Sequence, residues 1–220
     1  MLKEFEKRIL SSLIIIPISF FFIIQGSIFF IFFLSIFFLG SSYEWIKLNK
    51  KEVIKILLGI ILIFVSFYSA YHLRQNLGFL SFLFIVLICI FTDIGGYIFG
   101  KIFKGPKLTK ISPNKTYSGV FGSFILSIIG GLIYNYYFDL LEIKYLLNMD
   151  QAGTSLKLPF LLFILFISSI SQIGDLIISY FKRIAKVKNT GKILPGHGGL
   201  LDRIDGLIFA IPATQLLLSL

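Results

Sequence analysis

Three aspartates near the C-terminus are the residues best able to do chemistry in this sequence. Asp175 follows a long apolar run, and Asp202 and Asp205 follow a glycine-rich segment. Asp202 and Asp205 are three residues apart at an expected helix start, so both lie on one helix face. Mg²⁺ is usually held by one or two carboxylates together with substrate phosphates. We expect Asp175 and Asp202 to bind Mg²⁺, with Asp205 as a further ligand. Two alternatives stay open: an interfacial Asp175, and aspartates that serve the helix dipole.

The same stretch offers groups that could bind an anionic substrate. The segment Pro195-Gly-His-Gly-Gly199 cannot form a regular helix, and its glycines Gly196, Gly198 and Gly199 would let backbone N–H groups approach a phosphate. His197 could donate to phosphate. The candidate cations are Lys182, Arg183, Lys192 and Arg203. The alternatives are a flexible turn with an incidental histidine and basic charges at the membrane surface.

A second polar cluster lies in the middle of the chain. Asp93 is near the end of an apolar run, where a carboxylate is costly unless it serves an ion or a substrate, and it is a further metal candidate. The turn Ser112-Pro-Asn-Lys-Thr116 precedes the next apolar run and supplies Ser112, Asn114, Lys115 and Thr116. Such a turn at a helix N-terminus suits phosphate, and helix capping by Ser or Asn is the alternative. Gly96 and Gly100 have the spacing of close helix packing.

The elements that position these residues are predicted to be transmembrane helices. The 220 residues are 56% hydrophobic, with a mean hydropathy of +0.90 and 26 phenylalanines, which indicates a polytopic all-α membrane protein. About seven spans are expected, at 9–25, 27–46, 53–71, 77–99, 117–138, 158–178 and 204–220. We expect a single domain over residues 1–220. Cys89 is expected to be packed in the core.

The basic residues predict the orientation of these spans. If the N-terminus is cytoplasmic, 18 of the 21 lysines and arginines fall in cytoplasmic segments, as the positive-inside rule requires. This distribution accounts for the net charge of +10 without a nucleic-acid partner. We expect a multi-pass protein of a bacterial-type inner membrane, with its first apolar segment retained as a helix because no small-residue cleavage site follows it.

Both polar clusters resemble the phosphatidate cytidylyltransferases, or CDP-diacylglycerol synthases. The matching residues are Ser179 with Lys182-Arg183, Lys188-Asn189, Pro195-Gly-His-Gly-Gly199, Asp202-Arg203, Asp205, Gly174-Asp175-Leu176, Thr92-Asp93, Gly96-Tyr97, Ser112-Pro-Asn-Lys-Thr116 and Glu44-Trp45. The signature motifs span 92–119 and 174–206. The resemblance implies that CTP and phosphatidic acid react to CDP-diacylglycerol and pyrophosphate, with Mg²⁺ and a possible second cation as cofactors, membrane lipid as surroundings and a homodimer as assembly.

Three positions depart from the family pattern, each by losing an acid: Ser118, Ile178 and Asn189. These losses motivate one alternative, an inactive relative of the enzyme. A membrane transporter or ion pathway would explain Asp93 and Asp175 but leaves the glycine-rich segment without a role. A CTP-dependent kinase of a lipid alcohol would release CDP instead of pyrophosphate, and its hydroxyl nucleophile would need a base.

Overall fold

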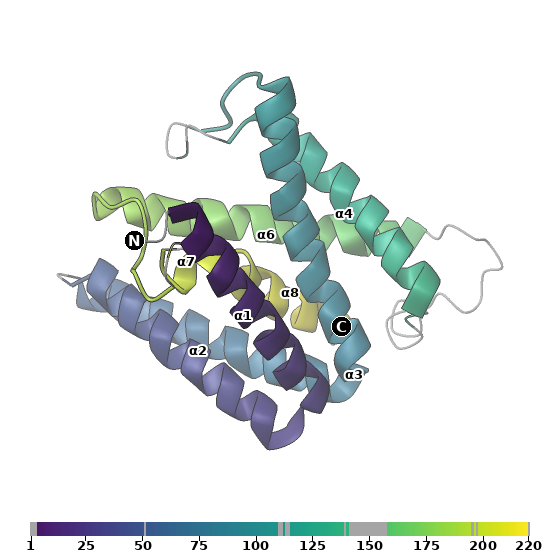
Figure 1. Ribbon diagram of the computed structural model, residues 1–220, viewed down its shortest axis with the longest axis horizontal. Helices are drawn as coiled ribbons and strands as arrows, with labels where there is room; N and C mark the ends of the chain where they lie inside the picture. The colour runs from purple at the N-terminus through teal and green to yellow at the C-terminus, as the bar shows by residue number, and fades with distance from the viewer. Residues whose placement is uncertain are drawn as a thin grey trace.

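The regular structure of the protein is helical. The computed structural model describes residues 4–50, 52–109, 112, 115–138, 140, 158–194, 196 and 198–219. The helices are α1 (Glu4–Gln25), α2 (Ser27–Leu48), α3 (Val53–Phe103), α4 (Tyr117–Phe138), α6 (Leu158–Ile184), α7 (Leu201–Ile204) and α8 (Leu207–Leu218) (Figure 1). In the described ranges the only other pairings are two isolated bridges, Lys107–Thr116 and Leu194–Gly198. The all-α prediction is therefore confirmed for this part of the chain.

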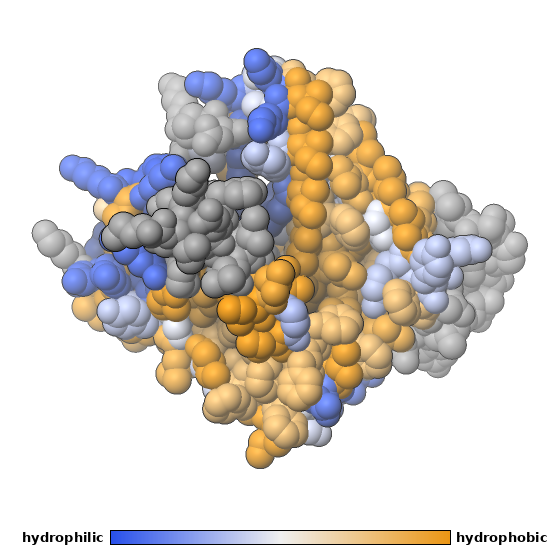
Figure 2. All heavy atoms as spheres, in the orientation of Figure 1, coloured by the Kyte–Doolittle hydropathy of each residue, from blue (hydrophilic) through white to orange (hydrophobic). Residues whose placement is uncertain are grey.

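Four of the described helices, α2, α3, α4 and α6, are long and apolar enough to cross a membrane by length and composition. Large apolar side chains cover much of the surface (Figure 2), including Ile28 at 72% exposure and Phe121 at 67%. A surface of this kind is typical of lipid contact. The predicted span at 204–220 is a helix of 12 residues after a break at Asp205 and Gly206, and about 18 Å of helix is shorter than a hydrocarbon core of about 30 Å. These helices indicate a membrane protein without fixing the number of spans at seven.

Two predicted spans, 53–71 and 77–99, form the single element α3. Its only non-helical residue is Gly78, with φ 73° and ψ 172°, conformations that glycine adopts without steric penalty. The chain changes direction here, so the first half of α3 runs beside α2 and the second half beside α4 (Figure 1). The two predicted segments are thus confirmed as helical, with the break after residue 77 and no separate loop at 72–76.

The first two helices form the predicted hairpin at Gln25-Gly26-Ser27. Gly26 has φ 64° and ends α1. Arg74 from α3 donates through Nε to the carbonyl of Ile23 at 3.1 Å and through Nη2 to the carbonyl of Ile24 at 2.9 Å. Those carbonyls lack partners within α1, because the last turn of a helix has no following N–H groups. Arg74 therefore fixes α1 and α2 against the middle of α3.

The second half of α3 and α4 approach each other through glycines. A Cβ added to Gly95 would lie 2.4 Å from the carbonyl oxygen of Gly122, and one added to Gly119 would lie 2.8 Å from that of Gly96. No larger side chain fits between these backbones. The predicted packing role of the glycine pattern is confirmed, and the crossing brings Asp93 close to the start of α4.

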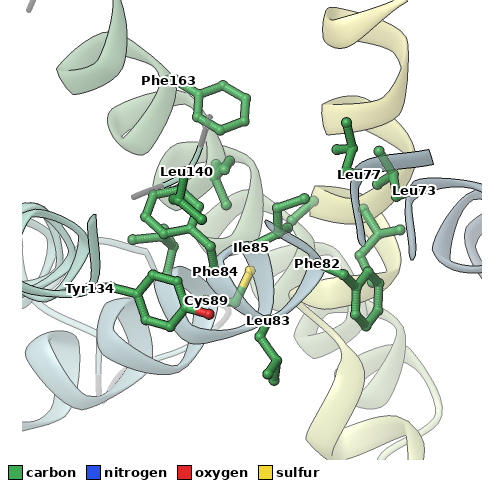
Figure 3. Close-up of a cluster of buried hydrophobic side chains, with 14 of the residues drawn as sticks. Leu73, Leu77, Phe82, Leu83, Phe84, Ile85, Cys89, Tyr134, Leu140 and Phe163 are labelled. Carbon is green, nitrogen blue, oxygen red and sulfur yellow. The ribbon is translucent and has the colours of Figure 1, made fainter. Parts of the chain in front are cut away.

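A buried apolar cluster holds α3 against α4 and α6. Phe84, Ile85 and Ile88 are almost completely buried, and Tyr134 of α4 donates through its hydroxyl to the carbonyl of Leu80 at 2.9 Å. Figure 3 shows Cys89 among the side chains of this cluster. Cys89 is 3% exposed, so its predicted packing in the core is confirmed.

The last residues of α2, α3 and α6 lie on one side of the molecule, at the left and top of Figure 1. Hydrophilic side chains gather on the same side in Figure 2. The basic residues Lys47, Lys101, Lys182 and Arg183 occupy the final turns of these helices. The fold thus places the two predicted chemical clusters at the polar end of an otherwise apolar bundle.

Candidate active site

A polar cavity of about 300 Å³ lies between α3, α4 and α6. Its lining residues are Thr92, Asp93, Gly96, Tyr97, Ser112, Lys115, Thr116, Gly119, Val120, Ser123, Gln172 and Asp175. The floor is held by hydroxyl contacts: Thr92 donates to Ser168 of α6 at 2.8 Å, and Ser123 of α4 donates to the carbonyl of Thr92 at 2.7 Å. Three helices are thereby fixed around one polar space, in which both predicted clusters meet.

Lys115 and Asp175 form the direct link between the two clusters. The Nζ atom of Lys115 lies 2.6 Å from Oδ2 of Asp175, and the two side chains are 26% and 27% exposed. Ser179, one helical turn after Asp175, donates to its Oδ1 at 3.2 Å. The partial burial of this pair strengthens its attraction compared with a pair at the surface. The carboxylate is thus held in place and remains accessible from the cavity.

Asp205 and Lys182 continue this network away from the cavity. The carboxyl groups of Asp175 and Asp205 interact electrostatically with each other. The Nζ atom of Lys182 lies 4.0 Å from Oδ2 of Asp205 and 2.9 Å from Oδ1 of Asp202. Lys182 is 9% exposed and Asp205 is 8% exposed. Lys182 therefore lies between Asp202 and Asp205, and the predicted common face of these two aspartates is the one that meets Lys182.

Asp202 also organises the glycine-rich loop, a name used here for the described residues 190–194, 196 and 198–200. Its Oδ2 accepts the backbone N–H of Thr190 at 2.9 Å and that of Gly199 at 3.0 Å. The second contact is half of a capping box, in which an acid in the first turn of a helix accepts an N–H just before it. Gly198 has φ 89°, a conformation that favours glycine. The predicted irregular loop is confirmed at its described residues, and the N–H of Gly199 is directed to Asp202.

Glu44 is a site residue to which the sequence alone assigned no role. Its carboxylate, 1% exposed, lies near the end of α2 and accepts hydrogen bonds from Thr190, Leu200 and Leu201. Glu44-Trp45 was one of the motifs that resemble the family, but that motif did not indicate these hydrogen-bond partners. The one available signal was an acid at the end of an apolar run, which is costly to bury unless it is hydrogen-bonded.

The remaining candidate residues occupy different surroundings. Asp93 is exposed at the cavity and interacts electrostatically with Asp175, Lys115 and Arg203. Thr116 accepts the N–H of Gly119 at 3.1 Å and so caps α4, whereas the capping alternative expected Ser or Asn in this role. Arg183 and Lys192 are exposed, and Arg183 donates to the carbonyl of Val187 at 3.4 Å. Asn114 and His197 lie outside the described residues.

The predicted metal site consists of the carboxylates of Asp175 and Asp202 together with phosphate oxygens of the substrate. Among the described residues, no group of three or more His, Cys, Asp or Glu side chains is arranged to hold a metal ion. Asp202 has its two oxygens directed to Lys182 and to backbone N–H groups, whereas Asp175 is held by Lys115 and Ser179. Each predicted ligand is therefore paired with one lysine ammonium group.

The three missing acids fall at positions of different character. Ile178 is 2% exposed and packs with Trp45 and Leu201 in an apolar cluster. Ser118 donates to the carbonyl of Lys104 and contacts the hydroxyl of Thr116. Asn189 lies beside Gly198, where a Cβ on the glycine would be 3.2 Å from its Cγ. Only Asn189 therefore changes the charge next to Asp202.

The site thus gathers two lysines, each paired with an aspartate, at or next to one polar cavity. A sequence model described as the cytidylyltransferase family matches residues 49–220. The chain belongs to this family. The match includes both motif regions and every predicted site residue, whereas Glu44 lies before it.

Curated members of the family give closer comparisons. The phosphatidate cytidylyltransferase of Staphylococcus epidermidis is 39% identical over 163 residues, which is 74% of this chain and 57% of the relative. That of Staphylococcus haemolyticus is 37% identical over 164 residues, again 74% and 57%. That of Brucella suis is 38% identical over 137 residues, or 62% of this chain and 46% of the relative. The chain thus spans about half the length of the curated relatives it matches.

Proposed function

We propose that this protein is a phosphatidate cytidylyltransferase, which transfers the cytidylyl group of CTP to phosphatidic acid and releases pyrophosphate. The observation that carries the proposal is the 2.6 Å contact between Lys115 and Asp175, which joins both signature motifs in one polar cavity. The names of relatives that are 37–39% identical support the same reaction. A cavity bounded by a cation and a carboxylate suits a phosphate-containing substrate and its counter-ion.

The proposed reaction depends on neutralising phosphate charge more than on a nucleophile or a general base from the protein. A phosphate oxygen of the lipid attacks the α-phosphorus of CTP, a P–O bond forms, and the bond to the leaving pyrophosphate breaks. The nucleophile is already an anion, so no strong general base is required. Lys115, Lys182 and Arg203 would hold the phosphates and oppose the charge that accumulates on the leaving group, in fixed positions that need little rearrangement.

In this proposal Asp175 and Asp202 would hold Mg²⁺, because both supply carboxylate oxygens. Two carboxylates with substrate phosphates are a usual ligand set for this ion, and the neighbouring Asp205 and Asp93 would support a second cation. Bound Mg²⁺ would supply positive charge next to the CTP phosphates. Lys115 and Lys182 contact the same carboxylates, and from these positions their ammonium groups would meet the substrate phosphates.

An apolar cavity accounts for the lipid substrate. It measures about 800 Å³ and is lined mainly by apolar residues of α1, α2, α3 and α8. Arg203 is a charged residue in this lining. Acyl chains would occupy the apolar part from the side of the bilayer, and Arg203 would meet the headgroup phosphate. Arg203 also interacts electrostatically with Asp93 of the polar cavity, so this side chain lies where the two substrates would meet.

The proposed location is the bacterial inner membrane, with the N-terminus and the polar end of the bundle in the cytoplasm. Seven embedded segments follow if α1, α8 and both halves of α3 are counted with α2, α4 and α6. The lysines and arginines at the ends of α2, α3 and α6 support this orientation. CTP would then reach the site from the cytoplasm, and a homodimer is the assembly implied by the family resemblance.

The test is product identification with detergent-purified protein, CTP and phosphatidic acid, with and without Mg²⁺. CDP-diacylglycerol and pyrophosphate in equal amounts, formed only with Mg²⁺, are expected. Release of CDP with a phosphorylated lipid alcohol would instead identify a kinase. Folded protein that yields no product but carries ions across a vesicle membrane would favour the transporter alternative and contradict the proposal.

A further inference from the structure

The carboxylate of Glu44 joins the N-terminal part of the chain to the glycine-rich loop. Its Oε2 accepts the hydroxyl of Thr190 at 2.8 Å and the N–H of Leu201 at 2.9 Å. Its Oε1 accepts the N–H of Leu200 at 3.0 Å. The two backbone groups belong to the start of α7, where N–H groups have no partner within the helix. A side chain of α2 therefore completes the N-terminus of α7.

The loop is shaped around this carboxylate. A Cβ added to Gly191 would lie 2.2 Å from Oε1 of Glu44, and one added to Gly199 would lie 2.4 Å from Oε2. Two glycines thus allow the backbone to enclose the buried carboxylate from both sides. Contacts of this closeness leave the loop little freedom to shift while Glu44 remains in place.

Thr190 connects Glu44 to the charged network of the site. Its hydroxyl donates to Glu44, and its backbone N–H donates to Asp202. Asp202 in turn accepts from Lys182 at 2.9 Å. Three steps therefore lead from α2 to a lysine proposed to hold phosphate, and each step is a hydrogen bond between described groups.

We propose that Glu44 is a positioning residue for nucleotide binding, which fixes the glycine-rich loop and, through Thr190 and Asp202, the ammonium group of Lys182. This inference rests on the proposed function, because it assigns the loop and Lys182 to the phosphates of CTP. Three donors converge on Glu44, so its role requires an acceptor at both oxygens, which a carboxylate provides and an amide does not. Glu44 itself is not proposed to contact a substrate.

The variants follow from this donor pattern. Glu44→Gln keeps the size of the side chain but directs an NH₂ group at one of the donors. Thr190→Val removes only the hydroxyl contact, and Thr190→Ser restores it. Ser41→Ala is the matched control, since Ser41 is fully buried one turn earlier in α2 and its hydroxyl bonds only within that helix.

Two readouts on the full chain in detergent separate positioning from simple stability. Hydrogen–deuterium exchange of peptides covering residues 198–203 reports on the N–H groups that Glu44 accepts. Steady-state kinetics gives KM separately for CTP and for phosphatidic acid. We expect Glu44→Gln to speed exchange at least tenfold and to raise KM for CTP about tenfold, with KM for the lipid within twofold. Thr190→Val should raise KM for CTP in the same direction, whereas Thr190→Ser and Ser41→Ala should leave it unchanged.

The outcomes distinguish this inference from the proposed function. A folded Glu44→Gln protein with faster exchange and an unchanged KM for CTP would overturn the positioning role. So would equal increases in both KM values, or an equal effect of Ser41→Ala. If Glu44→Gln does not fold, an unchanged KM for CTP in Thr190→Val overturns the inference instead. Wild-type protein that makes no product would contradict the proposed function. The inference would still be supported if CTP with Mg²⁺ slows hydrogen–deuterium exchange of the loop in the wild type but not in Thr190→Val.

Discussion

Lys115 and Asp175 meet at 2.6 Å, although Lys115 precedes α4 and Asp175 lies in the second half of α6. The contact requires the close glycine crossing of α3 and α4, which brings the start of α4 to the cavity. It also requires the hydroxyl contacts that bind α6 to α3. The proposed catalytic pair is therefore a product of helix packing, and disturbing the packing should disturb the pair.

The pair should behave as one unit in kinetics. Lys115→Met and Asp175→Asn should each lower kcat/KM by about 100-fold or more, a loss of about 2.7 kcal/mol or more in transition-state stabilisation. The double variant should be little worse than either single one, because contacting residues are not additive. Lys107→Met, an exposed lysine in the same loop, should retain activity. Additive losses in the double variant would mean that the two residues act independently.

Asp202→Asn should destabilise the protein as well as inactivate it. The substitution removes an acceptor that serves Lys182 or two backbone N–H groups, and a buried group without its partner costs about 1–3 kcal/mol. Thermal unfolding in detergent would show a lower Tm. Glu52→Gln is the matched control, because Glu52 pairs with Lys55 at the surface, where such pairs contribute about 0–1 kcal/mol. Equal Tm values for Asp202→Asn and the wild type would contradict the anchoring of the loop.

The glycine crossing predicts a difference between two similar substitutions. Gly95→Ala places a methyl group 2.4 Å from a backbone oxygen and should cost about 1–3 kcal/mol through overpacking. Gly100→Ala meets the hydroxyl of Thr116 at 3.2 Å, which needs only a small adjustment. Comparison of the two Tm values checks this, and a Gly95→Ala protein as stable as Gly100→Ala would show that α3 and α4 do not cross this closely.

Arg203 should act mainly on the lipid. Because it lines the apolar cavity, Arg203→Gln should raise KM for phosphatidic acid roughly tenfold, as expected from the loss of one charge-assisted hydrogen bond. Arg203→Lys keeps the charge and should show a smaller increase. If Arg203→Gln changes only the KM for CTP, Arg203 binds the nucleotide and not the lipid.

The sequence predicted local features better than long-range contacts. The apolar runs located α2 and α4 closely, because hydropathy is a local property, and Gly26 marked the first hairpin. The break in α3 was placed too early because the polar residues of 72–76 were interpreted as a loop, whereas the helix continues through them to Gly78. The role of Glu44 was missed, since its partner Thr190 is 146 residues away and no local pattern records that contact. The packing of α6 and α7 likewise decides two further sets of contacts. One joins Asp175 to Lys115, and the other joins Asp202 to Lys182 and the glycine-rich loop.

The most direct test of the proposed cytidylyl transfer follows the α-phosphorus of CTP in a single turnover. Wild-type protein, Lys115→Met and Lys107→Met would be mixed with phosphatidic acid, Mg²⁺ and CTP labelled at that phosphorus. We expect the label to enter the lipid fraction with wild-type protein and Lys107→Met, and at least about 100-fold more slowly with Lys115→Met. Label that stays in the aqueous nucleotide, or transfer that is as fast with Lys115→Met as with wild type, would contradict it.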